Sequence, residues 1–210
     1  MVDKDSLNSR QELIKEVSPP PSVIVVGLGG IGSYVAIELA MVGTKKLVLI
    51  DYDLVEESNR NRVLFNTDQV GMHKVDAIRE IIYRLRTDVE VVCIPKKTDN
   101  LGIHKKFIDK NAMLIDCRDN VEPFPEEFPA ITIKAGYDGL EGTLHINPDY
   151  SSIMGSGGDA YRSVPSYCVS ASLMAQWVTL YATVPSLHSK GEQVCTFSML
   201  DTWKTLLRGK

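Results

Sequence analysis

The amino-acid sequence predicts an α/β fold, a Rossmann-like doubly wound mixed sheet that is mostly parallel with added antiparallel strands. Short runs rich in Val and Ile alternate with segments of helical periodicity, which is the pattern of strand–helix–strand units. The 210 residues are 44% hydrophobic and 24% charged, as in ordinary globular domains. We therefore expect one domain over residues 22–210, preceded by an N-terminal arm over residues 1–21 that carries a helix.

Strands are predicted where short β-branched runs occur, and helices where apolar residues recur every three to four positions. In chain order, the predicted elements of the first half are a weak helix at 5–17, a strand at 22–27, a helix at 31–42, a strand at 46–51, a helix at 72–85, a strand at 89–94, a weak helix at 101–108 and a strand at 112–116.

The second half of the chain departs from this alternation. Segments 130–135 and 142–146 flank the turn pair Asp138-Gly139 and are predicted to form a strand pair beyond the parallel core. The remaining predicted elements are a surface loop rich in Ser, Gly and Pro at 147–166, a helix at 169–184 and a last strand at 194–200.

The charge balance and the lack of long apolar runs exclude several classes of function. Lys and Arg number 23 against 27 Asp and Glu, a formal net charge of −4, so a nucleic acid is not expected as the main partner. No run reaches the roughly 18 to 20 apolar residues that a membrane span needs, and the N-terminus has no leader-like pattern. We expect a cytoplasmic protein with no membrane partner.

A glycine-rich turn follows the first strand of the domain. Gly27, Gly29 and Gly32 form a G-x-G-x-x-G pattern that also includes Gly30 and opens a helix. Glycines let the backbone approach a phosphate closely, and a helix N-terminus offers free N–H groups. Asp51 ends the next strand, where a carboxylate can bind ribose hydroxyls. These residues predict a nucleotide site, and the glycine motif alone leaves NAD, FAD and ATP open.

The segment after Asp51 favours ATP over a dinucleotide. It places Asn59 and Arg62 beyond the carboxyl end of a parallel strand, where open α/β sheets bind their ligands. A hydride-transfer site has no need of this polar and basic cluster. An NAD-dependent oxidoreductase therefore remains only as an alternative.

Five motifs in register resemble the MoeB/ThiF family, relatives of the ubiquitin-activating enzymes, over nearly the whole chain. They are the glycine turn, the S-N-x-x-R pattern within 51–62, Val70-Gly-Met-His-Lys74, Asp116-Cys-Arg-Asp-Asn120 and the arm motif Asn8-Ser-Arg-Gln11. The resemblance implies ATP- and Mg²⁺-dependent adenylation of a carboxylate, with release of pyrophosphate.

The resemblance also implies roles for individual residues. Arg62 and Lys74 would supply positive charge to the phosphates, Asn59 a neutral donor and Asp119 a ligand for Mg²⁺. Arg10 matches a residue that, in the family, reaches into the site of the partner subunit of a homodimer. The implied nucleotide-binding set is completed by Gly27, Gly29, Gly30, Gly32, Asp51, Asp53 and Asn120.

The sequence also departs from the family pattern. Arg60 and Val63 replace its usual Leu and Gln. No C-x-x-C pair occurs among the four cysteines, so no zinc is expected, although many relatives hold it. Cys168 follows the 147–166 loop at the start of a predicted helix, where the helix dipole can activate a thiol. A thioester role for Cys168 is the alternative to the favoured interpretation, a buried structural thiol.

The expected substrate is the C-terminal glycine carboxylate of a small ubiquitin-like or sulfur-carrier protein ending in Gly-Gly. Within the family, the alternative is activation of a carboxylate on a modified tRNA nucleoside, which the missing zinc motif favours and the acidic charge disfavours. A non-catalytic scaffold is disfavoured because the charged motifs are complete. The sequence leaves open whether thiolation, a thioester or amine transfer follows adenylation.

Overall fold

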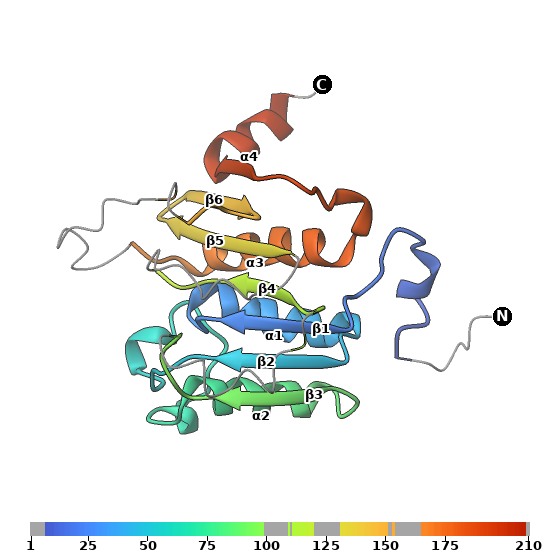
Figure 1. Ribbon diagram of the computed structural model, residues 1–210. Coiled ribbons are helices and arrows are strands. Elements are labelled where there is room, and N and C mark those ends of the chain that lie inside the picture. Colours follow the sequence, from blue (N-terminus) through green and yellow to red (C-terminus); the bar gives the residue numbers. More distant parts are fainter. Residues whose placement is uncertain are drawn as a thin grey trace.

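The computed structural model describes residues 7–98, 109, 111–119, 131–150, 153 and 165–208 (Figure 1). The strands in this part of the chain are β1 (Ser22–Val26), β2 (Lys46–Ile50), β3 (Glu90–Ile94), β4 (Met113–Asp116), β5 (Thr132–Asp138), β6 (Glu141–Ile146) and β7 (Gln193–Ser198). The α-helices are α1 (Gly30–Val42), α2 (Lys74–Leu85), α3 (Cys168–Thr183) and α4 (Met199–Arg208). The predicted helix at 101–108 lies outside the described residues.

All of these strands belong to one sheet, in the order β3-β2-β1-β4-β5-β6-β7. Strands β1 to β5 are parallel, and β6 and β7 pair antiparallel beyond them. The chain winds outward from β1 in one direction to β3 and then returns to place β4 on the other side of β1. The predicted fold class is therefore confirmed, and the reversal between β1 and β4 creates the crevice where such sheets bind ligands.

The helices α1, α2 and α3 lie on one face of the sheet, behind the strands in Figure 1. Strand side chains alternate between two faces, so Val23 and Val25 pack under these helices while Ile24 and Val26 join a second apolar cluster on the opposite face. Strands buried on both faces explain why the parallel core appears in the sequence as continuous apolar runs.

The C-terminal part differs from the prediction in two ways. Strand β5 is longer than expected and pairs parallel with β4, so it belongs to the parallel core, and the antiparallel addition begins only at β6. Strand β7 ends at Ser198, and α4 follows where a continued strand was expected. The Oγ of Ser198 accepts a hydrogen bond from the backbone N–H of Asp201 at 3.3 Å, an N-cap contact of the Ser-x-x-Asp type.

The predicted arm helix at 5–17 is wrong within the described residues. Only Gln11–Leu13 forms a short 3-10 turn, η1, and Leu7 and Leu13 remain 75% and 70% exposed. An amphipathic helix needs its apolar face buried, and this arm buries none. The arm is instead held by Arg86, whose Nη1 donates to Asn8 Oδ1 at 2.8 Å and to the Met41 carbonyl at 2.9 Å.

Among the described residues, no helix combines the length and the apolar content needed to cross a membrane.

Candidate functional site

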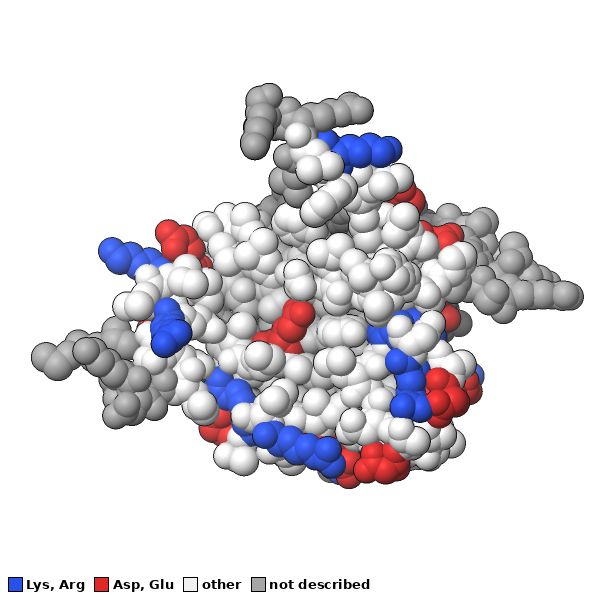
Figure 2. All heavy atoms as spheres, turned by 180° about the vertical axis from the view of Figure 1, so that it is seen from behind, with Lys and Arg blue, Asp and Glu red and all other residues white. Residues whose placement is uncertain are grey.

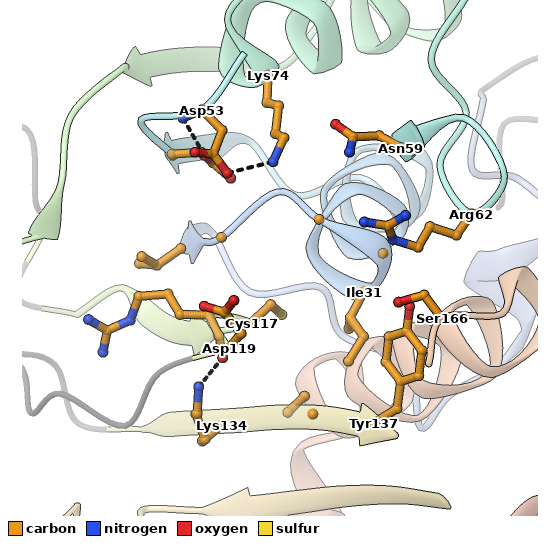
Figure 3. Close-up of a pocket in the computed structure, with 18 of the residues that line it drawn as sticks. Ile31, Asp53, Asn59, Arg62, Lys74, Cys117, Asp119, Lys134, Tyr137 and Ser166 are labelled. Carbon is orange, nitrogen blue, oxygen red and sulfur yellow. Dashed lines mark hydrogen bonds and ion pairs between the residues drawn. The ribbon is translucent and has the colours of Figure 1, made fainter. Parts of the chain in front are cut away.

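A cavity of about 1210 Å³ opens at the carboxyl edge of the parallel strands (Figure 3). It runs from the glycine turn after β1, past the ends of β2 and β4, to the open side of the β5–β6 hairpin. The predicted site residues that line it are Gly27, Gly29, Gly30, Asp51, Asp53, Asn59, Arg62, Lys74 and Asp119. The topology thus brings together motifs that lie up to 92 residues apart in sequence (Gly27 and Asp119).

The glycines of the turn serve different purposes. Gly27 has a φ of +81°, which a side chain disfavours, and a Cβ there would lie 2.9 Å from the Arg118 backbone. A Cβ on Gly32 would lie 1.9 Å from the Gly27 carbonyl oxygen, so Gly32 allows the helix to pack on the turn. Gly32 does not line the cavity, which corrects its expected contact with the nucleotide.

Gly29 is the glycine that faces open space. A Cβ built on it meets no atom within 4 Å among the described residues, and Gly29 precedes the first residue of α1. The N–H groups of the first turn of α1 therefore border an open space that an anion can enter. This open space beside the N-terminus of α1 is called the phosphate cradle below. It lies between the segment after β2, which carries Lys74, and the loop after β4, which carries Asp119 (Figure 3).

Asp51 holds the turn in shape. One carboxylate oxygen accepts a hydrogen bond from the Leu28 N–H at 2.6 Å, and the other accepts from the Asp53 N–H at 2.8 Å. Burial raises the pKa of this carboxyl above its ordinary value, while Lys74 and the two N–H donors act in the opposite direction. The two carboxylate oxygens thus link the glycine turn to the segment after β2.

Lys74 begins α2 and reaches the same wall of the cavity. Its side chain is 10% exposed, and its Nζ forms an ion pair with Asp53 Oδ2 at 2.7 Å. The Lys74 backbone N–H also donates to the Asp53 carbonyl. The ammonium group is therefore positioned by Asp53 rather than free in solvent.

Asn59 and Arg62 lie on the segment between β2 and α2, beside Lys74 in Figure 3. Asn59 is buried, and its Oδ1 accepts from the Glu56 N–H at 3.1 Å, which closes the short helix η2 (Glu57–Asn59). The Arg62 guanidinium donates to two neutral acceptors, the Ser58 carbonyl at 2.9 Å and Asn61 Oδ1 at 3.0 Å. Within the described part of the chain, Arg62 forms no ion pair, and its charge faces the cavity.

Asp119 lies on the opposite wall, below the turn in Figure 3, on the exposed loop after β4. The loop is fixed by Asp116, which is fully buried and accepts from Arg118 Nε at 2.9 Å and Arg118 Nη2 at 3.0 Å. Tyr150 also donates to Asp116, at 3.0 Å. Asn120, expected in the nucleotide set, lies outside the described residues.

The sequence analysis missed several residues of this cavity. Lys134 on β5 is buried, lies 3.6 Å from Asp116 Oδ2 and donates to the Arg118 carbonyl, and burial lowers its pKa. A lysine inside an apolar strand is the signal that could have identified it, because a buried charge needs partners. Tyr137 and His145 also line the cavity, and the sequence assigned neither a role. His145 lies on the predicted strand at 142–146, whereas Tyr137 lies beyond the predicted strand at 130–135, in the part by which β5 is longer.

Two predicted residues lie away from the cavity. Arg10 is exposed on the arm, which contacts the C-terminal end of α1 at the amino edge of the sheet. Cys168, for which a buried structural thiol was expected, is the first residue of α3 and is partly buried. Cys117 is the cysteine that lines the cavity, and burial raises the pKa of its thiol.

The residues present fit a nucleotide with Mg²⁺ better than a metal bound by protein alone. Within the described ranges, no three His, Cys, Asp or Glu side chains form a metal-binding group. Mg²⁺ is usually held by one or two carboxylates together with substrate phosphates. The carboxylate of Asp119, in the same cavity as the phosphate cradle, fits this ligand set.

A known protein family matches the part of the chain that contains the glycine turn. A family model described as the ThiF family matches residues 9–123, more than half of the chain. The chain belongs to the ThiF family. The matched range contains the ThiF glycine turn, the segment with Asn59 and Arg62, and Asp119.

Two curated relatives are both called ubiquitin-like modifier-activating enzyme 5. The protein of Culex quinquefasciatus is 42% identical over 126 residues, which is 54% of this chain and 32% of the relative. That of Drosophila willistoni is 44% identical over 126 residues, 60% of this chain and 29% of the relative. The ThiF-family chain thus spans about a third of the length of these relatives.

Solved structures share the ThiF-type fold. A crystal structure of PaaA has a TM-score of 0.64 at 26% identity and covers 86% of this chain and 61% of its own. A crystal structure of E. coli MccB has a TM-score of 0.66 at 16% identity and covers 95% of this chain and 71% of its own. The similarity to MccB, at this identity, concerns the fold alone.

Proposed function

We propose that this protein uses ATP and Mg²⁺ to adenylate the C-terminal glycine carboxylate of a small ubiquitin-like or sulfur-carrier protein. A carboxylate oxygen forms a bond to the α-phosphorus of ATP. The bond from that phosphorus to the bridging oxygen breaks, and pyrophosphate leaves with the electron pair. The product is an acyl-adenylate on the carrier protein.

The observation that carries this proposal is the union of three features in one cavity. The open space at Gly29 borders the N-terminus of α1, Arg62 faces it without an ion pair among the described residues, and Asp119 lies on the far wall. A carboxylate and a triphosphate repel each other, so their reaction requires positive charge and fixed positions. This cavity supplies both.

Each residue then has a defined task. The first turn of α1 binds phosphate oxygens through its N–H groups. Arg62 neutralises charge that develops on the phosphates, and Lys74 adds a cation held in place by Asp53. Mg²⁺, when bound, supplies further positive charge to the phosphates, and Asp119 is the residue that would hold it.

The class of the second substrate is supported by the relatives. Ubiquitin-like modifier-activating enzyme 5 is, by its name, an enzyme that acts on a ubiquitin-like modifier. The relatives match more than half of this chain, so the same class of substrate is proposed here. This supports a carrier protein over a tRNA nucleoside.

A homodimer with Arg10 acting in trans is part of the proposal. Arg10 lies at the amino edge of the sheet, whereas the cavity opens at the carboxyl edge (Figure 1). Within one chain, the arm and the cavity are therefore on opposite sides of the domain. If Arg10 contributes to the reaction, it does so in the cavity of a second copy.

Adenylation alone is proposed, without a thioester on Cys168. Cys168 does not line the cavity, and the adenylation step needs only the phosphate-binding residues. Cys168→Ser is expected to leave acyl-adenylate formation unchanged. A thiol-labile carrier adduct that disappears only in this variant would assign a thioester to Cys168.

The deciding experiment is ATP–pyrophosphate exchange with candidate carrier proteins ending in Gly-Gly, combined with calorimetry of nucleotide binding. We expect exchange that depends on both Mg²⁺ and the carrier, and that is lost in Asp119→Ala. Asp68→Ala, which removes an exposed carboxylate outside the cavity, is the control and is expected to retain exchange. Tighter binding of NAD than of Mg·ATP would contradict the proposal.

A further inference from the structure

The N-terminal arm is held on the domain by polar contacts at the C-terminal end of α1. Arg86 Nη1 donates to Asn8 Oδ1 of the arm at 2.8 Å and to the Met41 carbonyl of α1 at 2.9 Å. Gln11 Nε2 adds a second arm contact, a hydrogen bond of 2.7 Å to the Val42 carbonyl. Both carbonyls belong to the last turn of α1, where backbone acceptors lack partners within the helix. The arm therefore docks on a helix end, and the contact of Arg86 with Asn8 is called the arm clamp below.

Apolar burial does not explain this docking. The apolar side chains nearest the clamp are those of Leu7, Leu13 and Ile14, and they are 75%, 70% and 52% exposed. A short segment that buries so little gains too little free energy to offset its conformational entropy. A hydrogen bond of 2.7 Å from the Ser18 N–H to the Thr183 carbonyl holds only the later part of the arm. The order of the first part therefore depends on its polar contacts, of which the clamp is one.

Arg86 is itself fixed before it contacts the arm. Its side chain is 6% exposed, and its Nε and Nη2 donate to the two carboxylate oxygens of Asp88, each at 2.8 Å. Asp88 also forms an ion pair with Lys45 at 3.0 Å. A guanidinium held by two parallel bonds has a defined orientation, which leaves Nη1 directed at Asn8. Gly43 makes room for the arm, because a Cβ there would lie 2.5 Å from Asn8 Nδ2.

Arg10 lies two residues after Asn8 on this clamped arm. It is exposed, and among the described residues no hydrogen bond or ion pair occupies its guanidinium. Helix α1 is 13 residues long, so the clamp at its C-terminal end lies roughly 20 Å from the phosphate cradle at its N-terminal end. The clamp thus holds Arg10 away from the cavity of its own chain.

We infer that Arg86 is a positioning residue for Arg10: through Asn8 it fixes the arm, so that Arg10 is presented to the cavity of a second copy. This inference rests on the role in trans of Arg10 in the proposed function and deepens it. Arg86 contacts no reacting atom. Its effect is to order the arm before the second copy binds, which lowers the conformational entropy lost on assembly.

The direct test measures the mobility of the arm and needs no catalysis. Trypsin cuts after arginine in mobile segments, so cleavage between Arg10 and Gln11, followed by mass spectrometry, reports release of the arm. Asn8→Ala removes the acceptor of Arg86 and is expected to speed this cleavage at least about tenfold, whereas Asn8→Asp keeps a side-chain oxygen and should not. Glu16→Ala, at an exposed arm residue with no side-chain contact among the described residues, is the control. An unchanged cleavage rate in Asn8→Ala would overturn the inference.

A second variant links the effect to Arg86 itself. Arg86→Lys keeps a cation beside Asp88 but loses the branch that reaches Asn8, so it is expected to speed cleavage as much as Asn8→Ala does. Adding Asn8→Ala to Arg86→Lys should then change little, because both substitutions remove the same contact. Effects that add in full would show that the two residues act independently, which contradicts the clamp.

Mixing variants separates this inference from the proposed function. Asn8→Ala alone is expected to lower kcat for pyrophosphate exchange about tenfold with an unchanged Kd for ATP. Its equal mixture with Asp119→Ala should reach about a quarter of the wild-type activity, because each mixed dimer holds one complete site, against about a twentieth without help in trans. The lower value after verified exchange of subunits would overturn the positioning role and leave adenylation intact. A wild-type protein that never exchanges pyrophosphate would remove adenylation, while faster cleavage in Asn8→Ala would still support the clamp.

Discussion

At the scale of single residues, the cations of the cavity differ in how they are held. Lys74 is paired with Asp53, and Lys134 lies beside Asp116. Arg62 instead donates only to neutral acceptors among the described contacts, so its charge is available to a ligand. This difference identifies Arg62 as the side chain whose loss should affect the reaction more than the fold.

Arg62→Ala is expected to lower kcat/KM for adenylation by about 10²–10³-fold, or about 2.7 to 4 kcal/mol, as for the loss of one preorganised electrostatic group. Its free energy of unfolding should stay within about 0.5 kcal/mol of the wild type. Pyrophosphate exchange and urea unfolding measure the two effects. Arg84→Ala, at an exposed arginine of α2 outside the cavity, is the control. Equal activities of the two variants would remove Arg62 from the reaction.

Thiol reactivity is also decided residue by residue. Burial raises the pKa of Cys93 from 9.0 to about 11. Near pH 8, its thiolate fraction is then about 100-fold lower than for an unshifted thiol, so Ellman's reagent should label exposed Cys195 long before Cys93. The unfolded thiol ionises at lower pH than the folded one, so this group also reduces stability as pH rises from about 9 toward 11. Rapid labelling of Cys93 in the folded protein would contradict its burial.

At the scale of elements, the turn between β1 and α1 combines a packing requirement with a binding surface. Gly32→Ala places a methyl group on the Gly27 carbonyl, whereas Gly29→Ala points it into space that no described residue fills. The first variant is expected to lose about 1 to 3 kcal/mol of stability or more, as for overpacking. The second is expected to fold normally and to weaken ATP binding at least tenfold. Urea unfolding measures the stability of both variants, and calorimetry measures their ATP binding. A Gly32→Ala variant as stable as the wild type, or a Gly29→Ala variant that binds ATP as tightly as the wild type, would refute these separate roles.

At the scale of the whole molecule, the face covered by the helices is broadly uncharged. Figure 2 shows this face with few charged side chains near its centre and more of them around its margin. Met41 on α1 and Val169, Trp177 and Leu180 on α3 are between 42% and 55% exposed. Exposed apolar residues gathered on one face support a contact with a second copy, as the proposed role of Arg10 requires.

Mixing two inactive variants tests the assembly. Arg10→Ala and Asp119→Ala are each expected to be inactive alone, because each lacks one part of every site. Their mixture should recover about a quarter of the wild-type activity, since half of the dimers are mixed and each mixed dimer holds one intact site. Ultracentrifugation verifies the dimer, and mass spectrometry of a tagged partner verifies exchange of subunits. No recovery after verified exchange would exclude a role in trans for Arg10.

The sequence by itself determined most of the parallel core and the motifs at its edge. Local patterns in the sequence predict β1, β2 and β4 as apolar runs and α1 and α2 by their helical period. The segments that follow these strands carry the motifs: the glycine turn after β1, Asn59 and Arg62 after β2, and Asp119 after β4. Because parallel strands end at one edge of a sheet, these local patterns were sufficient to predict that the motifs meet.

Only the tertiary structure decided which side chains are paired, buried or open. The arm at 5–17 has helical spacing but finds no surface to bury its apolar face. The strand expected at 194–200 is confirmed up to Ser198, and α4 begins at Met199, inside its last two residues. Lys134 meets Asp116, and the Nδ1 of His145 is buried with no hydrogen-bond partner among the described residues, through contacts between residues distant in sequence. The free energy of such contacts depends on neighbours that local periodicity does not specify.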